Sequence, residues 1–330
     1  MKGVFRSNAL KSTFFLIIAA LLLFPQSSLC GGGNAYPNGA EGFMVGAAPP
    51  PGLTLINYLY FYDADEKRDG DGEEIAAFDH IKLWAEVLRL IWISKTKILG
   101  ANYGQHAFFL LTNVNLDFNQ PFGTEQKRHY RSTDLPYLIW SPCLLTWHLM
   151  EGRFHVVLDL ADLYIPLYNE KDDNLSAMGR NFWTIEPVLA MTYMPTRAWE
   201  FSVKLMYDFN TRQEDYVPGP PIRIDRTPGQ EFHMDFNTSY GITSNLRIGL
   251  GGYYYRQVTN DKFHHIERYP AALQSVLKDV EDDQSTVWAI GPGIWYKRGP
   301  VMATLRTQWE FLARNKTEGC NAWFKLIYLF

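Results

Sequence analysis

Four polar residues that alternate along one segment include the types that serine hydrolases use. His233, Asp235, Asn237 and Ser239 lie in residues 232–242, and a serine activated by a histidine base is a common arrangement for nucleophilic catalysis. A spacing of two places all four side chains on one face of a strand. We expect that face to point into a wet interior, where the four groups form a hydrogen-bond network. The pattern therefore predicts no catalytic residues and no cofactor.

Two other groups contain metal-ligating residue types. Clustered carboxylates suit calcium, and such a cluster comprises Asp63, Asp65, Asp69, Asp71, Glu73 and Glu74. Its spacing is not that of an EF-hand loop. The pair His264-His265, even with His80 added, lacks the ligand number and spacing of a zinc site. We predict no metal site. The acidic run is expected to be a solvated loop, or one that divalent cations bridge to lipopolysaccharide.

The last residues indicate which kind of element positions these groups. Apolar residues recur with a period of two at Phe324, Leu326, Tyr328 and Phe330, with Lys325 on the other face. This period predicts a strand, and about ten residues of tilted strand cross a bilayer. Taken alone, the segment also fits an edge strand of a soluble sheet. A terminal aromatic residue is, however, typical of the last strand of a bacterial outer-membrane barrel, where these four residues would be the barrel-assembly signal.

About twelve segments share this pattern, an even number as expected for such a barrel. The expected strands cover residues 53–62, 81–94, 103–115, 137–149, 153–165, 182–194, 199–210, 232–242, 246–258, 285–296, 301–315 and 320–330. Connectors alternate between long and short, except that the last long one shrinks to 316–319. We expect residues 211–231 to be a long loop and 270–280 to form a short helix. The fold class predicted is all-β, a transmembrane antiparallel up-and-down β-barrel of the outer-membrane type.

The more polar faces of these strands carry charges of both signs, which would be costly against lipid. We therefore predict that they line the lumen. The predicted lumen residues are Glu86, Arg89, His155, Asp159, Glu186, Glu200, Lys204, Asp208, His233, Asp235, Arg247, Arg306, Glu310 and Lys325. Lys82, Glu86 and Arg89 do not share one face of 81–94, which predicts a bulge in that strand.

The N-terminal region divides into two parts before the barrel. Residues 1–30 combine basic residues with an apolar core, which is typical of a secretory signal peptide. Residues 31–52 are rich in Gly and Pro and predict a flexible leader or a partial plug. The barrel itself is expected over residues 53–330, in the bacterial outer membrane.

Composition agrees with this class. Aromatic residues make up 15% of the 330 residues, and the formal net charge is −4. An apolar outer face and a wet inner face explain many aromatics in a chain of near-neutral hydropathy. The charge gives no indication of nucleic-acid binding, and three cysteines imply no disulfide framework.

Short motifs in a fixed order suggest a family. They lie in the leader at 36–52, the turn at 97–100, Trp147-His148, the segment 181–193 and Gly291-Pro292. In this order the sequence resembles the outer-membrane family labelled "putative meta-pathway of phenol degradation", also called SphA-like. The family's Gly-Asp-Leu before the fourth strand is replaced here by Thr133-Asp134-Leu135, which leaves that turn open. The resemblance implies a barrel that passes small hydrophobic molecules, and it supplies no catalytic residues.

Two functions stay open from the sequence. One is a channel for small hydrophobic, including aromatic, compounds. The other is a structural or surface-interaction barrel whose lumen is closed by salt bridges. Either one would have outer-membrane lipid, lipopolysaccharide and the barrel-assembly machinery as partners, and the channel would also bind a small hydrophobic ligand. An apolar track along the leader would favour the channel, whereas an ion-pair network across the bore would favour the closed barrel.

Overall fold

The computed structural model describes residues 36–119, 128–167, 176, 178, 180–219, 222–281 and 283–330. The predicted signal peptide (1–30) and the first part of the predicted leader (31–35) lie outside these ranges. Below, "leader" means residues 36–51.

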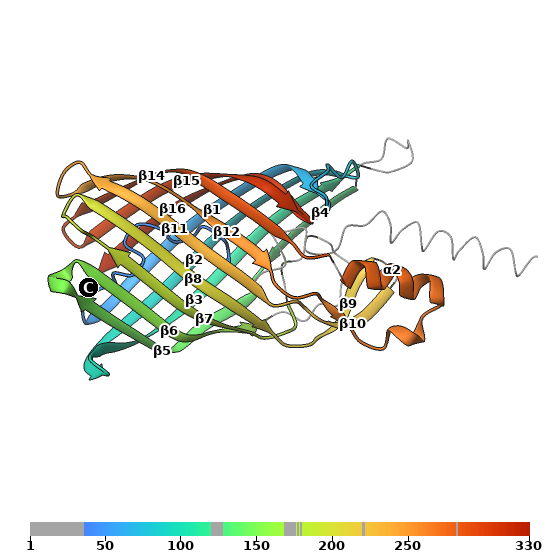
Figure 1. Ribbon diagram of the computed structural model, residues 1–330, viewed down its shortest axis with the longest axis horizontal. Helices are drawn as coiled ribbons and strands as arrows, with labels where there is room; N and C mark the ends of the chain where they lie inside the picture. Colours follow the sequence, from blue (N-terminus) through green and yellow to red (C-terminus); the bar gives the residue numbers. More distant parts are fainter. Residues whose placement is uncertain are drawn as a thin grey trace, which may run out of the picture.

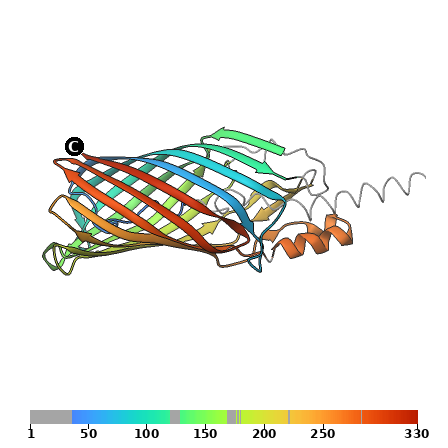
Figure 2. The ribbon, with the colours of Figure 1, turned by 90° about the horizontal axis from the view of Figure 1, so that it is seen from above.

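Long antiparallel strands close into a single barrel, as Figures 1 and 2 show. One sheet of 13 strands contains them, and 12 remain when β4, a continuation of β5, is set aside. They are β1 (Gly52–Arg68), β2 (Phe78–Ile98), β3 (Ala101–Phe118), β5 (Tyr137–Leu149), β6 (Phe154–Pro166), β7 (Thr184–Tyr193), β8 (Trp199–Asn210), β11 (Glu231–Gly241), β12 (Leu246–Gln257), β14 (Thr286–Arg298), β15 (Val301–Arg314) and β16 (Lys316–Leu329). Each pairs with its neighbour in sequence, and β16 pairs with β1. The predicted fold class is confirmed.

The connectors separate the two ends of the barrel. Short turns, including η1 (Met150–Gly152), gather at the end where the C-terminus lies (Figure 1). The opposite end carries long connections, although the last one is shorter than expected because Lys316 already belongs to β16. Short turns face the periplasm in barrels of this type. The leader joins β1 at this short-turn end.

A small subdomain extends beyond the barrel at the long-loop end (Figure 1). It contains β9 (Gln213–Gly219), β10 (Ile222–Thr227), β13 (Lys262–Phe263), η2 (Ile266–Arg268) and α2 (Ala271–Glu281). Its own core comprises Tyr216, Ile224, Phe263, Leu273 and Leu277. The predicted helix is present. The long loop predicted for 211–231 contains β9 and β10, which pair with each other, and β13 of another loop completes their sheet.

β4 (Arg128–Asp134) extends the barrel wall on one side. It pairs with β3 beyond the point where β5 stops, so β4 and β5 together cover one edge of β3. The break between them falls at Leu135-Pro136. Proline has no N–H to donate to the sheet, so it interrupts the ladder at this point.

The two faces of the strands are reversed relative to a soluble protein. In β8, Trp199, Phe201 and Phe209 are 46%, 49% and 45% exposed. Between them, charged side chains such as Glu200 and Asp208 are fully buried inside. A greasy outside and a polar inside suit a barrel in a bilayer. Among the described residues, no helix is both long and apolar enough to cross a membrane.

β2 departs from the expected pattern in one respect. Its pairing with β3 runs without a shift from Ile81 to Ile93, so the predicted bulge is absent there. Lys82 and Glu86 therefore lie outside, in line with the exposed Trp84, and Arg89 lies inside. The lumen position predicted for Glu86 was wrong. Its carboxylate accepts a hydrogen bond from Asn57 on β1 at 3.0 Å.

The final strand places its alternating residues on opposite faces. Phe324, Leu326, Tyr328 and Phe330 are exposed on the outside, while Lys325 is buried inside. The Phe330 N–H donates to the Leu53 carbonyl at 3.2 Å, next to the seam where β16 meets β1. The last residue of the chain thus helps to close the barrel at the short-turn end.

Candidate functional site

The leader lies inside the barrel and is held there by carboxylates of the wall. Asp235 on β11 accepts three hydrogen bonds from it, from the Tyr36 hydroxyl at 2.7 Å and from the N–H groups of Gly39 and Glu41 at 2.9 and 3.0 Å. Further along, the Met44 N–H donates to Glu200 at 2.6 Å. A leader without regular structure leaves its N–H groups unpaired, and these lumen acceptors satisfy several of them.

Glu41 is the charged residue of the leader, and cations from two strands surround it. Lys325 on β16 and Arg89 on β2 lie 2.7 and 3.1 Å from its carboxylate. The Tyr58 hydroxyl donates to the same carboxylate at 2.7 Å. Burial would raise the pKa of the Glu41 carboxyl, but Lys325, Arg89 and Lys204 outweigh it and hold that pKa well below its ordinary value. The Glu41 carboxyl is therefore ionised at physiological pH.

Phe43 anchors the leader in a recess made by glycines. Gly249 on β12 and Gly293 on β14 are direct cross-strand partners. A Cβ atom on either would lie 2.9 Å from the ring of Phe43, which is closer than carbon atoms normally approach. Only glycine at these two positions leaves room for the ring, so the Gly-rich segments of β12 and β14 are fitted to the leader.

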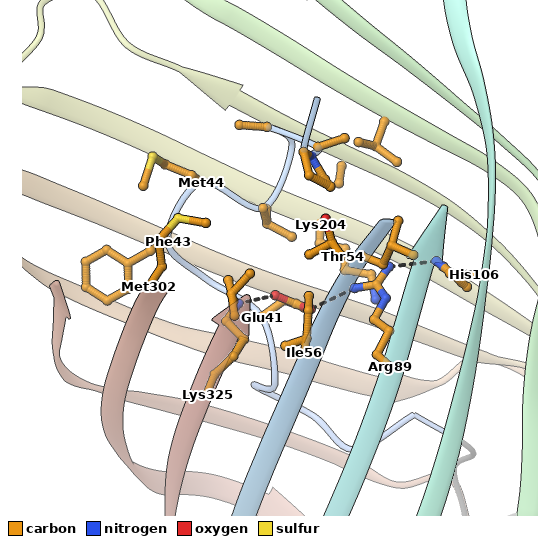
Figure 3. Close-up of a pocket in the computed structure, with 18 of the residues that line it drawn as sticks. Glu41, Phe43, Met44, Thr54, Ile56, Arg89, His106, Lys204, Met302 and Lys325 are labelled. Atoms are coloured by element: carbon orange, nitrogen blue, oxygen red, sulfur yellow. Dashed lines mark hydrogen bonds and ion pairs between the residues drawn. The ribbon is translucent and has the colours of Figure 1, made fainter. Parts of the chain in front are cut away.

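A cavity of about 280 Å³ lies between the leader and the wall towards the short-turn end (Figure 3). Its wall is mostly apolar. The apolar lining includes Ile56, Ile91, Leu144, Val157, Val188, Ala190 and Ile327. Charged and titratable side chains also reach the cavity, and they are Glu41, Arg89, His106, Asp159, Asp162, Lys204, Lys297 and Lys325. The site therefore combines a greasy surface with a few converging polar groups, which is the usual make-up of a small-molecule site.

Two smaller cavities continue from it along the leader. The next one, about 20 Å³, shares Glu41 and Lys204 with the first and is bounded by Tyr58 and Phe108. A third, of about 60 Å³, shares Val87 and Leu110 with the second. Together the three cavities form an apolar track on the β1–β3 side of the leader, with a constriction in the middle.

Lys204 on β8 places a positive charge beside this track. Its ammonium lies 4.0 Å from the ring centre of Tyr36, a cation–π contact. Within the described part of the chain, no hydrogen bond or ion pair joins it to another residue. It lines both the large cavity and the constriction. A polar group on a passing molecule would meet a donor here.

His106 on β3 belongs to a hydrogen-bond network at the charged end of the cavity. Arg89 donates to its Nδ1 at 2.7 Å. Its Nε2 therefore carries a proton and donates to Asp162 of β6 at 2.5 Å. Asp159 lies near the same nitrogen at 3.3 Å and accepts from the Ser141 hydroxyl at 2.6 Å. These hydrogen bonds engage both nitrogens of His106, whereas Asp159 Oδ2 has no hydrogen-bond partner among the described residues.

The structure places the predicted lumen residues as follows. Nine of the ten inward positions on the later strands are buried; these are Glu186, Glu200, Lys204, Asp208, His233, Asp235, Arg247, Arg306 and Lys325. Glu310 is half-buried and accepts from the Tyr62 hydroxyl at 2.7 Å. Arg89 and Asp159 also contact the lumen network, and the half-buried His155 packs against His148. Glu41, Tyr58, His106 and Asp162 were not predicted. Glu41 had a signal in the sequence, as a lone charge in the segment 36–52.

The hydrolase residue types on β11 do not come together. The Ser239 hydroxyl donates to Glu200 at 2.6 Å and accepts from Arg247 at 3.0 Å. His233 instead contacts Asn38 of the leader at 2.7 Å. The serine and the histidine therefore belong to separate hydrogen-bond groups, and the four residues of β11 do not form one network with each other.

The closed barrel, its reversed faces and its polar lumen define an outer-membrane β-barrel. The chain belongs to the family described as "Putative MetA-pathway of phenol degradation", whose model matches residues 64–326. The resemblance seen in the short motifs is thereby confirmed. No curated protein sequence matches the chain significantly.

Solved structures share the fold. An outer-membrane channel from Pseudomonas putida F1 superposes with a TM-score of 0.68 at 12% identity, covering 90% of this chain and 100% of that one. The autotransporter translocator domain NalP from Neisseria meningitidis gives 0.46 at 11% identity, covering 86% and 90% of the two chains. A deltaS2S3 mutant of the TodX monoaromatic hydrocarbon channel gives 0.43 at 10%, covering 93% and 99%. At these identities the first comparison establishes the barrel fold alone, and the other two add nothing to it.

Proposed function

We propose that this barrel passes small hydrophobic molecules, aromatic compounds among them, across the outer membrane. The observation that carries the proposal is the apolar track beside the leader. A water-filled pore has polar walls, whereas here the inner faces of β1 to β3 present Ile56, Val87, Ile91 and Leu110. Contact between an apolar surface and water is unfavourable, so an apolar wall inside a barrel favours the binding of an apolar ligand.

The size of the cavity narrows the class of ligand. About 280 Å³ is near the lower limit of small-ligand sites, which span roughly 300–1,000 Å³. This suits small molecules better than long-chain ones. The family description, with its phenol degradation, adds the aromatic class. The polar end at Arg89 and Lys204 would orient a hydroxyl group on such a ring.

The constriction gives the leader its proposed role as a gated plug. The middle cavity of about 20 Å³ admits no ring while the leader stays in place, so the leader must shift for passage. Residues 31–52 are then a plug domain, and residues 53–330 are the channel wall. No residue of this barrel acts as a catalyst in the proposal, since transport needs none.

A closed structural barrel is the second candidate, and one observation favours it. The Glu41 ion pairs link β16 to β2 through the leader, and Arg306 of β15 donates to the carbonyls of Gly39 and Glu41. Such a network closes the bore as long as it is intact. The long loops would then contact lipopolysaccharide or other partners on the cell surface.

Uptake by cells with and without this gene separates the two functions. Labelled toluene, phenol and a long-chain fatty acid would be supplied at limiting concentration, with a small hydrophilic sugar as the control. For a selective channel, we expect faster uptake of toluene or phenol and unchanged uptake of the sugar. A change in sugar uptake alone would identify a general pore. If none of the four compounds were affected, the closed barrel would be favoured.

Assembly in the membrane gives a further prediction, based on the proposal that Phe324, Leu326, Tyr328 and Phe330 are read by the barrel-assembly machinery. Deletion of Phe330 should strongly lower the amount of folded barrel, because it removes both the exposed terminal ring and the hydrogen bond to Leu53. The shift in gel migration between boiled and unboiled membranes measures the folded fraction. Leu312→Ala, which removes another exposed apolar side chain, is the control. Equal folded fractions for the deletion and the control would contradict the proposed signal.

A further inference from the structure

Three carboxylates form a row across neighbouring strands near the long-loop end of the lumen. Glu231 of β11 is the direct partner of Asp208 on β8, and the register of β7 and β8 places Glu186 opposite Asp208. All three side chains are buried. Like charges directly opposite each other destabilise a sheet. In the described part of the chain no lysine or arginine forms an ion pair with any of the three, and the basic group beside them is His233.

His233 lies beside this row in the orientation of a metal ligand. Its Nδ1 is 2.7 Å from the amide oxygen of Asn38 and donates a proton to it. The other nitrogen, Nε2, points towards Asp208 and Glu231, and it becomes a metal ligand when an ion displaces its proton. Histidines that bind metals are commonly held in this way, with the remote N–H bonded to a protein oxygen.

The distances fit a shared ion better than hydrogen bonds. Nε2 of His233 lies 3.3 Å from Asp208 Oδ2 and 3.6 Å from Glu231 Oε2. Charge-assisted hydrogen bonds are shorter, at about 2.7–2.9 Å. Ligands about 2.0–2.1 Å from a tetrahedral Zn²⁺ ion are separated from one another by about 3.3–3.4 Å. The ligand atoms of all three residues lie within 4.8 Å of one another.

Asp208 supplies an independent indication. It is fully buried, and neither of its carboxylate oxygens has a hydrogen-bond partner among the described residues. The His106 group offers the contrast, because it also joins a histidine to two aspartates. There Arg89 occupies Nδ1, and the Nε2 proton bonds Asp162. The two sets therefore differ at the aspartates. Both oxygens of Asp208 lack a hydrogen-bond partner among the described residues, whereas Asp159 lacks one at Oδ2 alone and Asp162 accepts from His106.

We propose that Asp208, Glu231 and His233 bind a divalent transition-metal ion of the Zn²⁺ class, with Glu186 adjacent. An imidazole with carboxylates suits such an ion, whereas Ca²⁺ and Mg²⁺ prefer oxygen ligands alone. The site would also tie the leader to the wall, because Asn38 holds the imidazole. The inference does not depend on transport.

Metal titration of the full-length barrel in detergent tests the site. After treatment with a chelator, the protein is titrated with Zn²⁺ against a chromophoric competitor, and with Co²⁺ while its absorption spectrum is recorded. We expect one Zn²⁺ per chain and a Co²⁺ spectrum that contains a nitrogen ligand. Asp208→Asn and His233→Asn should abolish both. Asn38→Ala, which removes the group that orients His233, should weaken binding by about 10–100-fold.

Matched controls separate this site from adventitious binding. His106→Asn alters the similar group in which hydrogen bonds already engage both nitrogens of the histidine, and it should leave Zn²⁺ binding unchanged. Asp208→Asn removes a like charge, so this variant should fold at least as well as wild type without metal. Zn²⁺ should then raise the thermal midpoint of the wild type and of His106→Asn, and leave that of Asp208→Asn unchanged. The proposal is overturned if the wild type binds no stoichiometric Zn²⁺, if His106→Asn loses as much binding as His233→Asn, or if Asp208→Asn still binds.

Discussion

Replacing Glu41 by glutamine should release the leader and turn a nearly closed barrel into a conducting pore. The substitution leaves Lys325 and Arg89 buried beside a neutral amide. Removal of one partner from a buried ion pair costs about 3–5 kcal/mol. That corresponds to a roughly 100- to 4,000-fold increase in the undocked leader. Single-channel recordings in planar bilayers should show long open events that are rare in the wild type.

Two further variants show whether charge or leader position causes the opening. Glu86→Gln changes an exposed glutamate on the outside of the barrel and should leave conductance unchanged. Gly46→Val should open the pore without changing any charge, because a Cβ on Gly46 would lie 2.5 Å from the backbone nitrogen of Thr192 on β7. If Glu41→Gln and Gly46→Val both conduct like the wild type, the leader does not close the bore.

The sequence predicted the barrel well because its strongest signals are local. In β8, charged and aromatic residues alternate with a period of two, and either face could be read directly as lumen or lipid. Connector lengths then gave the orientation of both ends. The sheet of β9, β10 and β13 was missed because its strands come from two different loops, and no local pattern links them.

The functional site was harder to predict because it depends on contacts between distant residues. Glu41 meets Lys325 at a separation of 284 residues, and no periodicity connects a leader without regular structure to its partners on the wall. β2 carries apolar residues on both faces, with Val87 inside and Leu88 outside. The alternation between polar and apolar residues therefore did not indicate which face of β2 points into the lumen. The apolar track can be recognised only in the closed barrel.

Filling the constriction should abolish uptake of hydrophobic molecules. Val87 is buried and lines both the middle and the third cavity. A tryptophan at this position exceeds the middle cavity of about 20 Å³ and seals the track whether or not the leader moves. Such overpacking costs about 1–3 kcal/mol, which is less than the roughly 5–15 kcal/mol by which folded domains are stable. Cells with Val87→Trp should take up toluene or phenol no faster than cells without the gene.

The adjacent residue provides the matched control for this block. Leu88→Trp adds an aromatic ring on the same strand, but its side chain is 41% exposed on the outer face, where aromatic residues are common in barrels. Its uptake should equal that of the wild type, and both variants should show the same folded fraction on gels. Unchanged uptake in Val87→Trp would mean that substrates do not follow the β1–β3 side of the leader. Equal loss in both variants would mean instead that a tryptophan anywhere on β2 disturbs the barrel. Only a loss confined to Val87→Trp places the path inside the lumen, because the two variants add the same ring to opposite faces of one strand.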